Sequence, residues 1–448
     1  MEFTGTISGM FVLAVLFVVG RLLVQATLWH RDTTALQVRL FTTAILVRFA
    51  FSLALYQFGL VSILGDFDSV GWIYGMALRA SWDALGYGLV DLPVAWANAF
   101  QGNHLGYYYL SGTVFFLLGG VSRMACAAVN CFLGALTVVF AYRVGRTLFS
   151  EKVAVRVGWW VCLFPSMIIW SAQTIKEPVV IFLEMVALYG CLRLKRRFAM
   201  RYVIATGAAV IMIVPFRFYA AYITAAAVCM ALVMPELKRG RTAIASGIGV
   251  IALVLVFGVS SGFLARSEMA MEQFDVKFIE EFRHNIAVGS GSGVEASFDM
   301  GTPTGFGLAT FVGAAHLLLA PFPWQLRVGS LRMLLTTPEL IYWWWLFFVG
   351  VVPGARYLLR TRFSDILPVL IFTIGLGLLY SMLFGNIGLI FRQRAQILPW
   401  LFLFGAVGLE RRAALKARKV TQLESGRVLV PTDVIVGLPD TAAWRPAR

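Results

Sequence analysis

The sequence predicts an all-α protein that crosses a membrane about eleven times. Of its 448 residues, 59% are hydrophobic and only 14% are charged, and the mean hydropathy is +0.80. Soluble domains contain about 25% charged residues. Apolar runs of roughly 20 residues, the length that a helix needs to cross the hydrocarbon core, recur along the chain. These observations indicate a polytopic membrane protein.

The expected membrane spans are apolar runs separated by short polar or basic segments. Their approximate centres are Phe17, Leu53, Gly134, Cys162, Val186, Val210, Ala226, Leu253, Phe347, Gly375 and Leu403. The first run is expected to remain in the protein, because the residues before it lack the basic segment that begins a cleavable signal peptide.

Six basic clusters predict the orientation of these spans, because short cytoplasmic loops are enriched in Lys and Arg. The clusters lie at Arg31–Arg39, Arg143–Arg156, Arg193–Arg201, Lys238–Arg241, Arg356–Arg362 and Arg411–Arg448. All six face one side if about eleven helices cross, with the N-terminus outside and the C-terminus inside. Topology and anionic inner-leaflet lipid then account for the net charge of +15, so no nucleic-acid partner is expected.

Two further apolar runs would reverse this orientation if they crossed. Tyr107–Leu118 and Leu308–Trp324 are therefore expected to lie as helices in the outer interface, within two long outer loops. The expected order is an N-terminal transmembrane hairpin (1–64), a first extracytoplasmic loop with an acidic motif (65–122), a central transmembrane bundle (123–262), a second extracytoplasmic loop (263–338), C-terminal transmembrane helices (339–410) and a basic cytoplasmic tail (411–448).

Ionisable residues at the outer ends of the expected helices form the candidate site, because charge at membrane depth marks a functional site by default. Asp66 and Asp68 directly follow an apolar run, and Arg392 and Arg394 lie where the positive-inside rule disfavours paired arginines. A phosphate or pyrophosphate clamp would explain this arginine pair. The other candidates are Arg123, Lys176, Glu177 and Arg217. Arg21 and Arg48, inside predicted spans, are expected to pair within the bundle, with Glu184 as a candidate partner for either.

Residues 48–194 resemble a family of membrane enzymes. The run from Asp68 through Trp72 to Ala77 is similar to the Asp-x-x-x-Tyr-x-x-x-Ala signature in the first outer loop of GT-C glycosyltransferases, with Trp72 in place of the usual Tyr. These multi-spanning enzymes use polyprenyl-phosphate sugars; protein O-mannosyltransferases and the lipid A aminoarabinose transferase are examples. Phe164–Ser166 and Lys176–Pro178 resemble later landmarks of the family, although Glu177 replaces the more frequent Asp.

The resemblance implies a GT-C-like fold and transfer of a sugar from a polyprenyl-phosphate-linked donor to an acceptor hydroxyl. The site would face the extracytoplasmic side of a bacterial cytoplasmic membrane. Such a transfer needs a base for the incoming proton and cations for the departing phosphate. Asp68 occupies the position that the family uses for its base. The expected site residues are Asp68, Asp66 and Glu177 for catalysis, and Arg123, Lys176, Arg217, Arg392 and Arg394 for the donor phosphate.

Several alternatives remain open from the sequence. Asp66 and Asp68 form an Asp-x-Asp pair that can bind a divalent cation such as Mg²⁺ or Mn²⁺, whereas the histidines have no metal-ligand spacing. A lipid-linked polysaccharide polymerase or ligase would depend more on outer-loop Arg and His. A lipid or solute transporter predicts broken helices, a charged midplane site and an internal repeat. The sequence specifies neither the sugar nor the acceptor.

Overall fold

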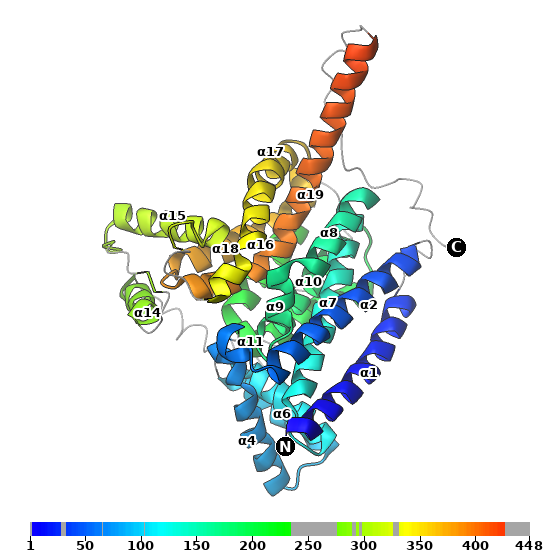
Figure 1. Ribbon diagram of the computed structural model, residues 1–448, viewed down its shortest axis with the longest axis vertical. Coiled ribbons are helices and arrows are strands. Elements are labelled where there is room, and N and C mark those ends of the chain that lie inside the picture. Colours follow the sequence, from blue (N-terminus) through cyan, green and yellow to red (C-terminus); the bar gives the residue numbers. More distant parts are fainter. Residues whose placement is uncertain are drawn as a thin grey trace.

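The computed structural model describes residues 2–27, 33–64, 66–102, 104–233, 276–288, 293–294, 298–325 and 331–425. Within these ranges the chain folds into packed helices, and an isolated β-bridge between Gly293 and Asn386 is the only extended pairing (Figure 1). The predicted all-α class is thus confirmed. The expected span centred at Leu253, the basic cluster Lys238–Arg241 and the tail after Ser425 lie outside the described residues.

The N-terminal half contains α1 (Glu2–Ala26), α2 (Thr34–Gln57), α3 (Val61–Leu64), η2 (Phe67–Val70), α4 (Trp72–Ala84), η3 (Leu89–Asp91), α5 (Leu92–Ala97), η4 (Asn98–Gln101), α6 (Gly106–Leu118), α7 (Arg123–Leu148), α8 (Glu151–Leu163), α9 (Pro165–Ser171), α10 (Glu177–Leu194) and α11 (Met200–Val233). The C-terminal half contains α14 (Val276–Val288), α15 (Pro303–Leu319), α16 (Leu331–Leu346), the π-helical turn η6 (Phe347–Val351), α17 (Val352–Thr361), α18 (Phe363–Met382) and α19 (Ile387–Ser425).

The described helices include several that are long and apolar enough to cross a membrane. By length and hydropathy these are the five helices α1, α2, α7, α11 and α18, and the bent pair α8–α9 makes a sixth if it counts as one span. The protein is therefore a multi-pass membrane protein. The total of about eleven spans stays a prediction.

Helix α11 consists of two segments that run in opposite directions. Arg217 departs from helical geometry, with φ −154° and ψ 85°. Thr206, before this point, donates a hydrogen bond to the Ala187 carbonyl of α10 (3.5 Å), and the Val228 carbonyl, after it, accepts one from Cys191 of α10 (3.9 Å). Both segments thus lie along the same stretch of α10. The two spans predicted on either side of Arg217 correspond to these segments.

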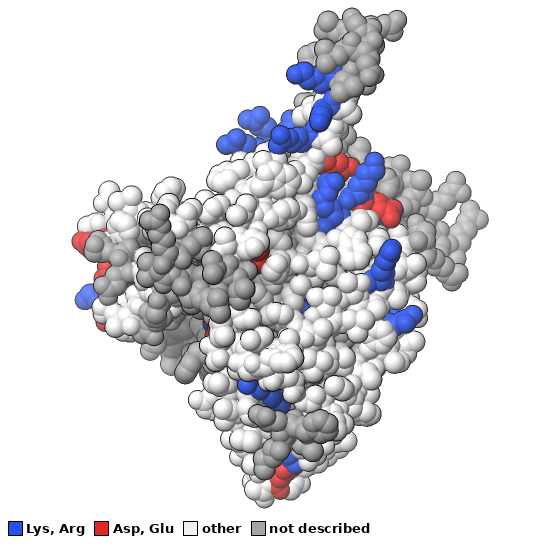
Figure 2. All heavy atoms as spheres, viewed as in Figure 1, with Lys and Arg blue, Asp and Glu red and all other residues white. Residues whose placement is uncertain are grey.

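The described basic clusters gather at one end of the bundle, hereafter the basic end. Contacts between them are Arg143 Nε to Gln37 Oε1 (2.8 Å), Arg196 to the Thr147 carbonyl, Lys195 Nζ to the Ser364 carbonyl (2.5 Å) and Ser150 Oγ to Glu410 Oε2 (3.0 Å). Figure 2 shows Lys and Arg side chains concentrated over α8, α17 and α19, above a broad face that carries little charge. The common side that the sequence predicts for these clusters is thus observed.

The opposite end, hereafter the site end, holds the starts of α7, α10 and α19 and the turn at Arg217. Helices α4 and α6 pack together there (Figure 1), with Trp82 and Tyr109 ring centroids 5.9 Å apart. Gly75 permits this packing, because a Cβ atom would lie 2.1 Å from Ser111 Oγ. The helices expected at Tyr107–Leu118 and Leu308–Trp324 correspond to α6 and α15. Their interfacial location stays a prediction.

The bent pair α8–α9 turns by 54° at Phe164. Pro165 has no N–H group, so the carbonyls at the end of α8 lack helical partners. Arg48 of α2, which is fully buried, donates hydrogen bonds to the carbonyls of Val161 (2.8 Å) and Cys162 (2.9 Å). Arg48 is thus bonded within the bundle, as expected, but to the carbonyls freed by the bend and not to the candidate partner Glu184.

The other side of the same bend is satisfied by a carboxylate. The Ser166 N–H, at the start of α9, donates to Glu339 Oε2 (2.7 Å), and Glu339 is itself buried. An unsatisfied backbone group in hydrocarbon costs several kcal/mol. Arg48 and Glu339 therefore stabilise a bend that would otherwise be unfavourable within a membrane.

Replacing Arg48 by Leu is expected to lower the free energy of unfolding by about 2–4 kcal/mol, because two buried carbonyls lose their donors. Arg21→Leu, at an exposed arginine on the neighbouring helix α1, should change it by no more than about 0.5 kcal/mol. Unfolding in mixed detergent micelles, followed by circular dichroism, measures both. Equal stability of the two variants would contradict the role of Arg48.

Candidate functional site

Four ion-pairing side chains form a continuous chain at the site end. Asp66 Oδ1 lies 2.6 Å from Arg392 Nη1, Arg392 Nε lies 3.2 Å from Glu177 Oε1, and the same Glu177 oxygen lies 2.6 Å from Arg217 Nη2. The Asp66 side chain is 16% exposed and that of Glu177 is fully buried. The chain of ion pairs thus runs from the surface into the bundle. We call these four residues the ion-pair chain.

Local structure explains why these side chains meet. Glu177 is the first residue of α10, where the partial positive charge of a helix N-terminus favours a carboxylate. Arg217 leaves helical geometry immediately after Pro215 and Phe216. Arg392 lies in the first turns of α19, whose start is capped by Asn386: its Oδ1 accepts hydrogen bonds from the N–H groups of the second and third helical residues, at 2.7 and 3.2 Å.

A buried polar network extends the ion-pair chain deeper into the bundle. Arg217 Nη1 donates to the Tyr380 hydroxyl (2.8 Å) and also to Gln396. Gln396 Nε2 in turn donates to Glu184 Oε1 (2.7 Å). Glu184 follows Glu177 by seven residues on α10, or about 10 Å along the helix axis. A buried polar network whose members are hydrogen-bonded to one another is rigid. This network therefore fixes the position of Arg217.

The acidic segment after α3 is held against the loop between α9 and α10. The Asp66 N–H donates to Gln173 Oε1 (2.8 Å), and the Ser69 carbonyl accepts a hydrogen bond from Thr174 Oγ1 (2.6 Å). The backbone on both sides of Asp68 is therefore fixed. The Asp68 side chain lies outside the described residues, so its role as general base stays a prediction.

Arg123, at the start of α7, contacts this acidic segment rather than the ion-pair chain. Its Nη2 donates to the carbonyl and the hydroxyl of Ser69, each at 3.2 Å. Its guanidinium also lies 4.3 Å from the ring centre of Tyr56 and 5.7 Å from that of Trp72. Among the described side chains these partners are all neutral. Lys176, directly before α10, is partly exposed.

Arg394 does not join Arg392 in the ion-pair chain, and their predicted phosphate clamp stays a prediction. Arg394 Nη1 donates to the Ala320 carbonyl (2.8 Å), and its guanidinium lies 4.5 Å from the ring centre of Phe391. The sequence predicts Arg392 and Arg394 between two spans, but both belong to helix α19, which already begins at Ile387. Residues two positions apart on a helix do not face each other. Arg394 therefore points away from the ion-pair chain.

The segment that contains Trp96 and His104 packs onto the turn that presents Arg217. His104 is the one non-glycine residue with positive φ in the described ranges (φ 65°), and its Nδ1 lies 2.9 Å from the Phe216 carbonyl. The rings of Trp96 and Phe216 lie 6.4 Å apart. Non-glycine residues in this strained region persist when surrounding contacts hold them. His104 thus links the loop to the residue directly before Arg217.

Several residues at this site were not predicted from the sequence. Gln173, Thr174, Tyr380 and Gln396 supply hydrogen bonds that hold Asp66, Ser69 and Arg217 in place. Polar side chains within otherwise apolar segments are the signal that could have identified them. No group of three or more His, Cys, Asp or Glu side chains that could hold a metal occurs in the part of the chain that the structure describes.

We expect Glu177 and Arg217 to be energetically coupled. Glu177→Gln should cost about 3 kcal/mol of unfolding free energy, because it leaves a buried guanidinium without its counter-ion. The double variant with Arg217→Gln should be more stable than the sum of the single variants predicts, by at least about 1 kcal/mol. A double-mutant cycle in mixed micelles measures this coupling.

The control cycle uses Glu151 and Arg146, an ion pair at 3.5 Å in which the Glu151 side chain is 42% exposed. Its coupling should stay within about 0.5 kcal/mol. Additive effects of the Glu177 and Arg217 replacements would show that the pair contributes nothing specific.

No family model and no curated protein sequence matches the chain. Comparison with solved structures does give matches. The oligosaccharyltransferase of Archaeoglobus fulgidus, in its apo form, matches 88% of this chain and 52% of its own, at 15% identity and a TM-score of 0.48. ArnT from Cupriavidus metallidurans, bound to undecaprenyl phosphate, matches 87% of this chain and 63% of its own, at 17% identity and a TM-score of 0.49.

The Archaeoglobus fulgidus enzyme tethered to an acceptor peptide with the NVT sequon matches 88% of this chain and 51% of its own, at 15% identity and a TM-score of 0.46. This chain therefore spans less than two thirds of the length of each of these proteins.

Proposed function

We propose that the protein is a membrane glycosyltransferase that moves a sugar from a polyprenyl-phosphate-linked donor to an acceptor hydroxyl. The ion-pair chain is the observation that carries this proposal, because it concentrates acids and arginines at one end of the bundle. The described basic clusters lie at the other end, and the positive-inside rule assigns such an end to the cytoplasm. The reaction would therefore take place at the extracytoplasmic face of a bacterial cytoplasmic membrane.

The chemistry requires few groups. The acceptor oxygen forms a bond to the anomeric carbon, while the bond from that carbon to the lipid phosphate breaks and the phosphate leaves with the electron pair. The proton of the acceptor hydroxyl passes to a carboxylate, for which Asp68 is the candidate, with Asp66 beside it. General-base catalysis of this kind contributes typically 10²–10⁴-fold.

The donor phosphate is expected near Arg123. Arg217 and Arg392 already share the carboxylates of Glu177 and Asp66. Arg123 contacts the residue that follows Asp68, and its partners among the described side chains are neutral. A phosphate at this position would bring the leaving group and the base to the same segment. Arg217, Arg392 and Glu177 would then hold the surrounding structure and its charge balance, with Lys176 at the rim.

One observation favours a second candidate, a lipid or solute transporter. Transporters use broken helices at their binding sites, and α8–α9 is a broken span. Here the groups freed by the bend are bonded to Arg48 and Glu339 of the protein itself. This pattern is typical of a bend stabilised for structural reasons, so the transferase is the preferred proposal. A lipid-linked polysaccharide polymerase or ligase is distinguished from it by the test of the acidic residues.

Asp68→Asn is expected to lower sugar transfer at least about 100-fold, because the base for the acceptor proton is lost. The measurement uses purified protein in nanodiscs with radiolabelled polyprenyl-phosphate sugars. Asp83→Asn serves as the matched control, since Asp83 is an exposed acid on α4 of the same loop. Full activity of the Asp68 variant would refute its role. Persistent activity without both Asp66 and Asp68 would favour the polymerase or ligase, and lipid movement without a covalent product would favour the transporter.

Arg123→Gln is expected to raise the apparent KM for the lipid-linked donor about 10- to 100-fold, because a charge-assisted contact to the phosphate is lost. Arg79→Gln, at a partly exposed arginine on α4, should leave the KM unchanged. Steady-state kinetics with varied donor concentration separates the two. An unchanged KM in the Arg123 variant would place the phosphate elsewhere in the site.

A further inference from the structure

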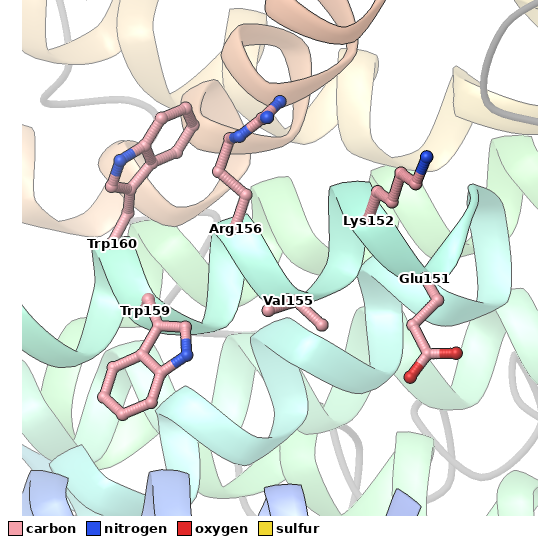
Figure 3. A pocket seen from close by; sticks show the side chains of 6 residues that line it. All are labelled: Glu151, Lys152, Val155, Arg156, Trp159 and Trp160. Carbon is pink, nitrogen blue, oxygen red and sulfur yellow. The ribbon is translucent and has the colours of Figure 1, made fainter.

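Helix α8 carries an open hollow at the basic end, far from the ion-pair chain. The hollow has a volume of about 530 Å³ and is lined by Glu151, Lys152, Val155, Arg156, Trp159 and Trp160 (Figure 3). All of these residues lie on α8, so a single helix presents both the charged and the aromatic part of the surface. The proposed transfer reaction uses none of them.

The cationic side of this hollow comes from two residues one turn apart. Lys152 is exposed and Arg156 is partly exposed, and Figure 3 shows both pointing to the same side of α8. Residues four apart on a helix are neighbours, about 5–6 Å apart between Cβ atoms, so one phosphate group can contact both. Arg156 Nη1 donates to the Ala406 carbonyl of α19 (3.2 Å). This bond fixes the guanidinium in place, and its other N–H groups remain as donors.

Glu151 is the one acid that lines the hollow, and its charge is partly compensated. Figure 3 shows it pointing to the opposite side of α8 from Lys152 and Arg156. Its Oε2 lies 3.5 Å from Arg146 Nη2. The side of the hollow that holds Lys152 and Arg156 therefore favours an anion.

The aromatic part of the hollow follows directly along the helix. Trp159 and Trp160 are both partly buried, and Leu163, one turn further, is 48% exposed. Trp is enriched where membrane meets water, because its ring is amphipathic. Figure 3 shows Trp160 on the side of α8 that carries Lys152 and Arg156, whereas Trp159 points to the side of Glu151. The order on the cationic side is thus cations, then Trp160, with the exposed aliphatic Leu163 following along the helix. A phospholipid has the same order of anionic head group, glycerol region and acyl chain.

We propose that this hollow is a binding site for an acidic phospholipid of the leaflet that contacts the basic end. Basic residues near an anionic membrane surface each strengthen binding by roughly fivefold. A free phosphate would use the cations but leave Trp160 without a role, whereas a lipid uses both. The site is separate from the proposed reaction, so a failure of one does not affect the other.

Native mass spectrometry of the full-length protein with an equimolar mixture of phosphatidylglycerol and phosphatidylcholine tests the proposal. The wild type should retain phosphatidylglycerol preferentially. The double variant Lys152→Gln, Arg156→Gln should lose at least about tenfold in affinity for phosphatidylglycerol and lose this preference. Arg360→Gln with Arg412→Gln removes two exposed arginines from the same end outside the hollow, and it should bind as the wild type does. Equal binding by both double variants would overturn the proposal.

Two further measurements keep the test independent of folding defects. Glu151→Gln should strengthen phosphatidylglycerol binding, because it removes the acid from the hollow, and such a gain cannot arise from misfolding. Unchanged or weaker binding by this variant would count against the site. Inorganic phosphate at millimolar concentration should not displace the lipid, and Trp160→Ala should weaken lipid binding. Displacement by phosphate, or no effect of the Trp160 replacement, would indicate a simple anion site and refute the lipid.

Discussion

The burial of Glu177 between two arginines is the interaction on which the arrangement of the site end depends. A carboxylate without solvent is stable only if it is paired and hydrogen-bonded, and Arg217 and Arg392 provide the pairing. Each arginine comes from a different part of the chain, so the pairing brings α10, the turn in α11 and the start of α19 to one place. Asp66 then attaches the segment after α3 to the same group through Arg392.

The bundle separates two kinds of charge along its length. At the basic end, arginines and lysines contact amide and carbonyl oxygens, aromatic rings and partly exposed acids near the surface. At the site end, Arg217 and Arg392 are buried and bonded to acids. In between, charge is tolerated where it satisfies backbone groups, as Arg48 does at the α8–α9 bend. This separation is the physical basis for assigning the two ends to opposite sides of the membrane.

The sequence was most informative about properties that many residues determine together. Apolar length and the distribution of Lys and Arg predicted the all-α class and the common side of the described basic clusters, because membrane insertion acts on these properties. The reversal at Arg217 was also expected, since two apolar runs flank it. Eight residues were predicted to form one site, and the structure brings four of them, Asp66, Glu177, Arg217 and Arg392, into contact.

Predictions about individual side chains were less successful, for reasons of geometry. Arg394 was grouped with Arg392. Because α19 begins at Ile387, both arginines lie two residues apart on this helix, and their side chains point to different sides of it. Arg48 was given an acidic partner, whereas Pro165 creates unpaired carbonyls that bind it instead. The roles of Gln173 and Gln396 depend on contacts between residues more than 100 positions apart, which spacing along one sequence does not reveal.

The most direct test of this account is the side of the membrane to which the site end belongs. A membrane-impermeant maleimide can label single cysteines introduced by Asp83→Cys, on α4 at the site end, and by Arg360→Cys, at the basic end, in intact cells. We expect labelling of the Asp83 variant from outside and of the Arg360 variant only after the membrane is permeabilised. The reverse pattern would place the ion-pair chain on the cytoplasmic side and contradict a transferase that acts on the extracytoplasmic face.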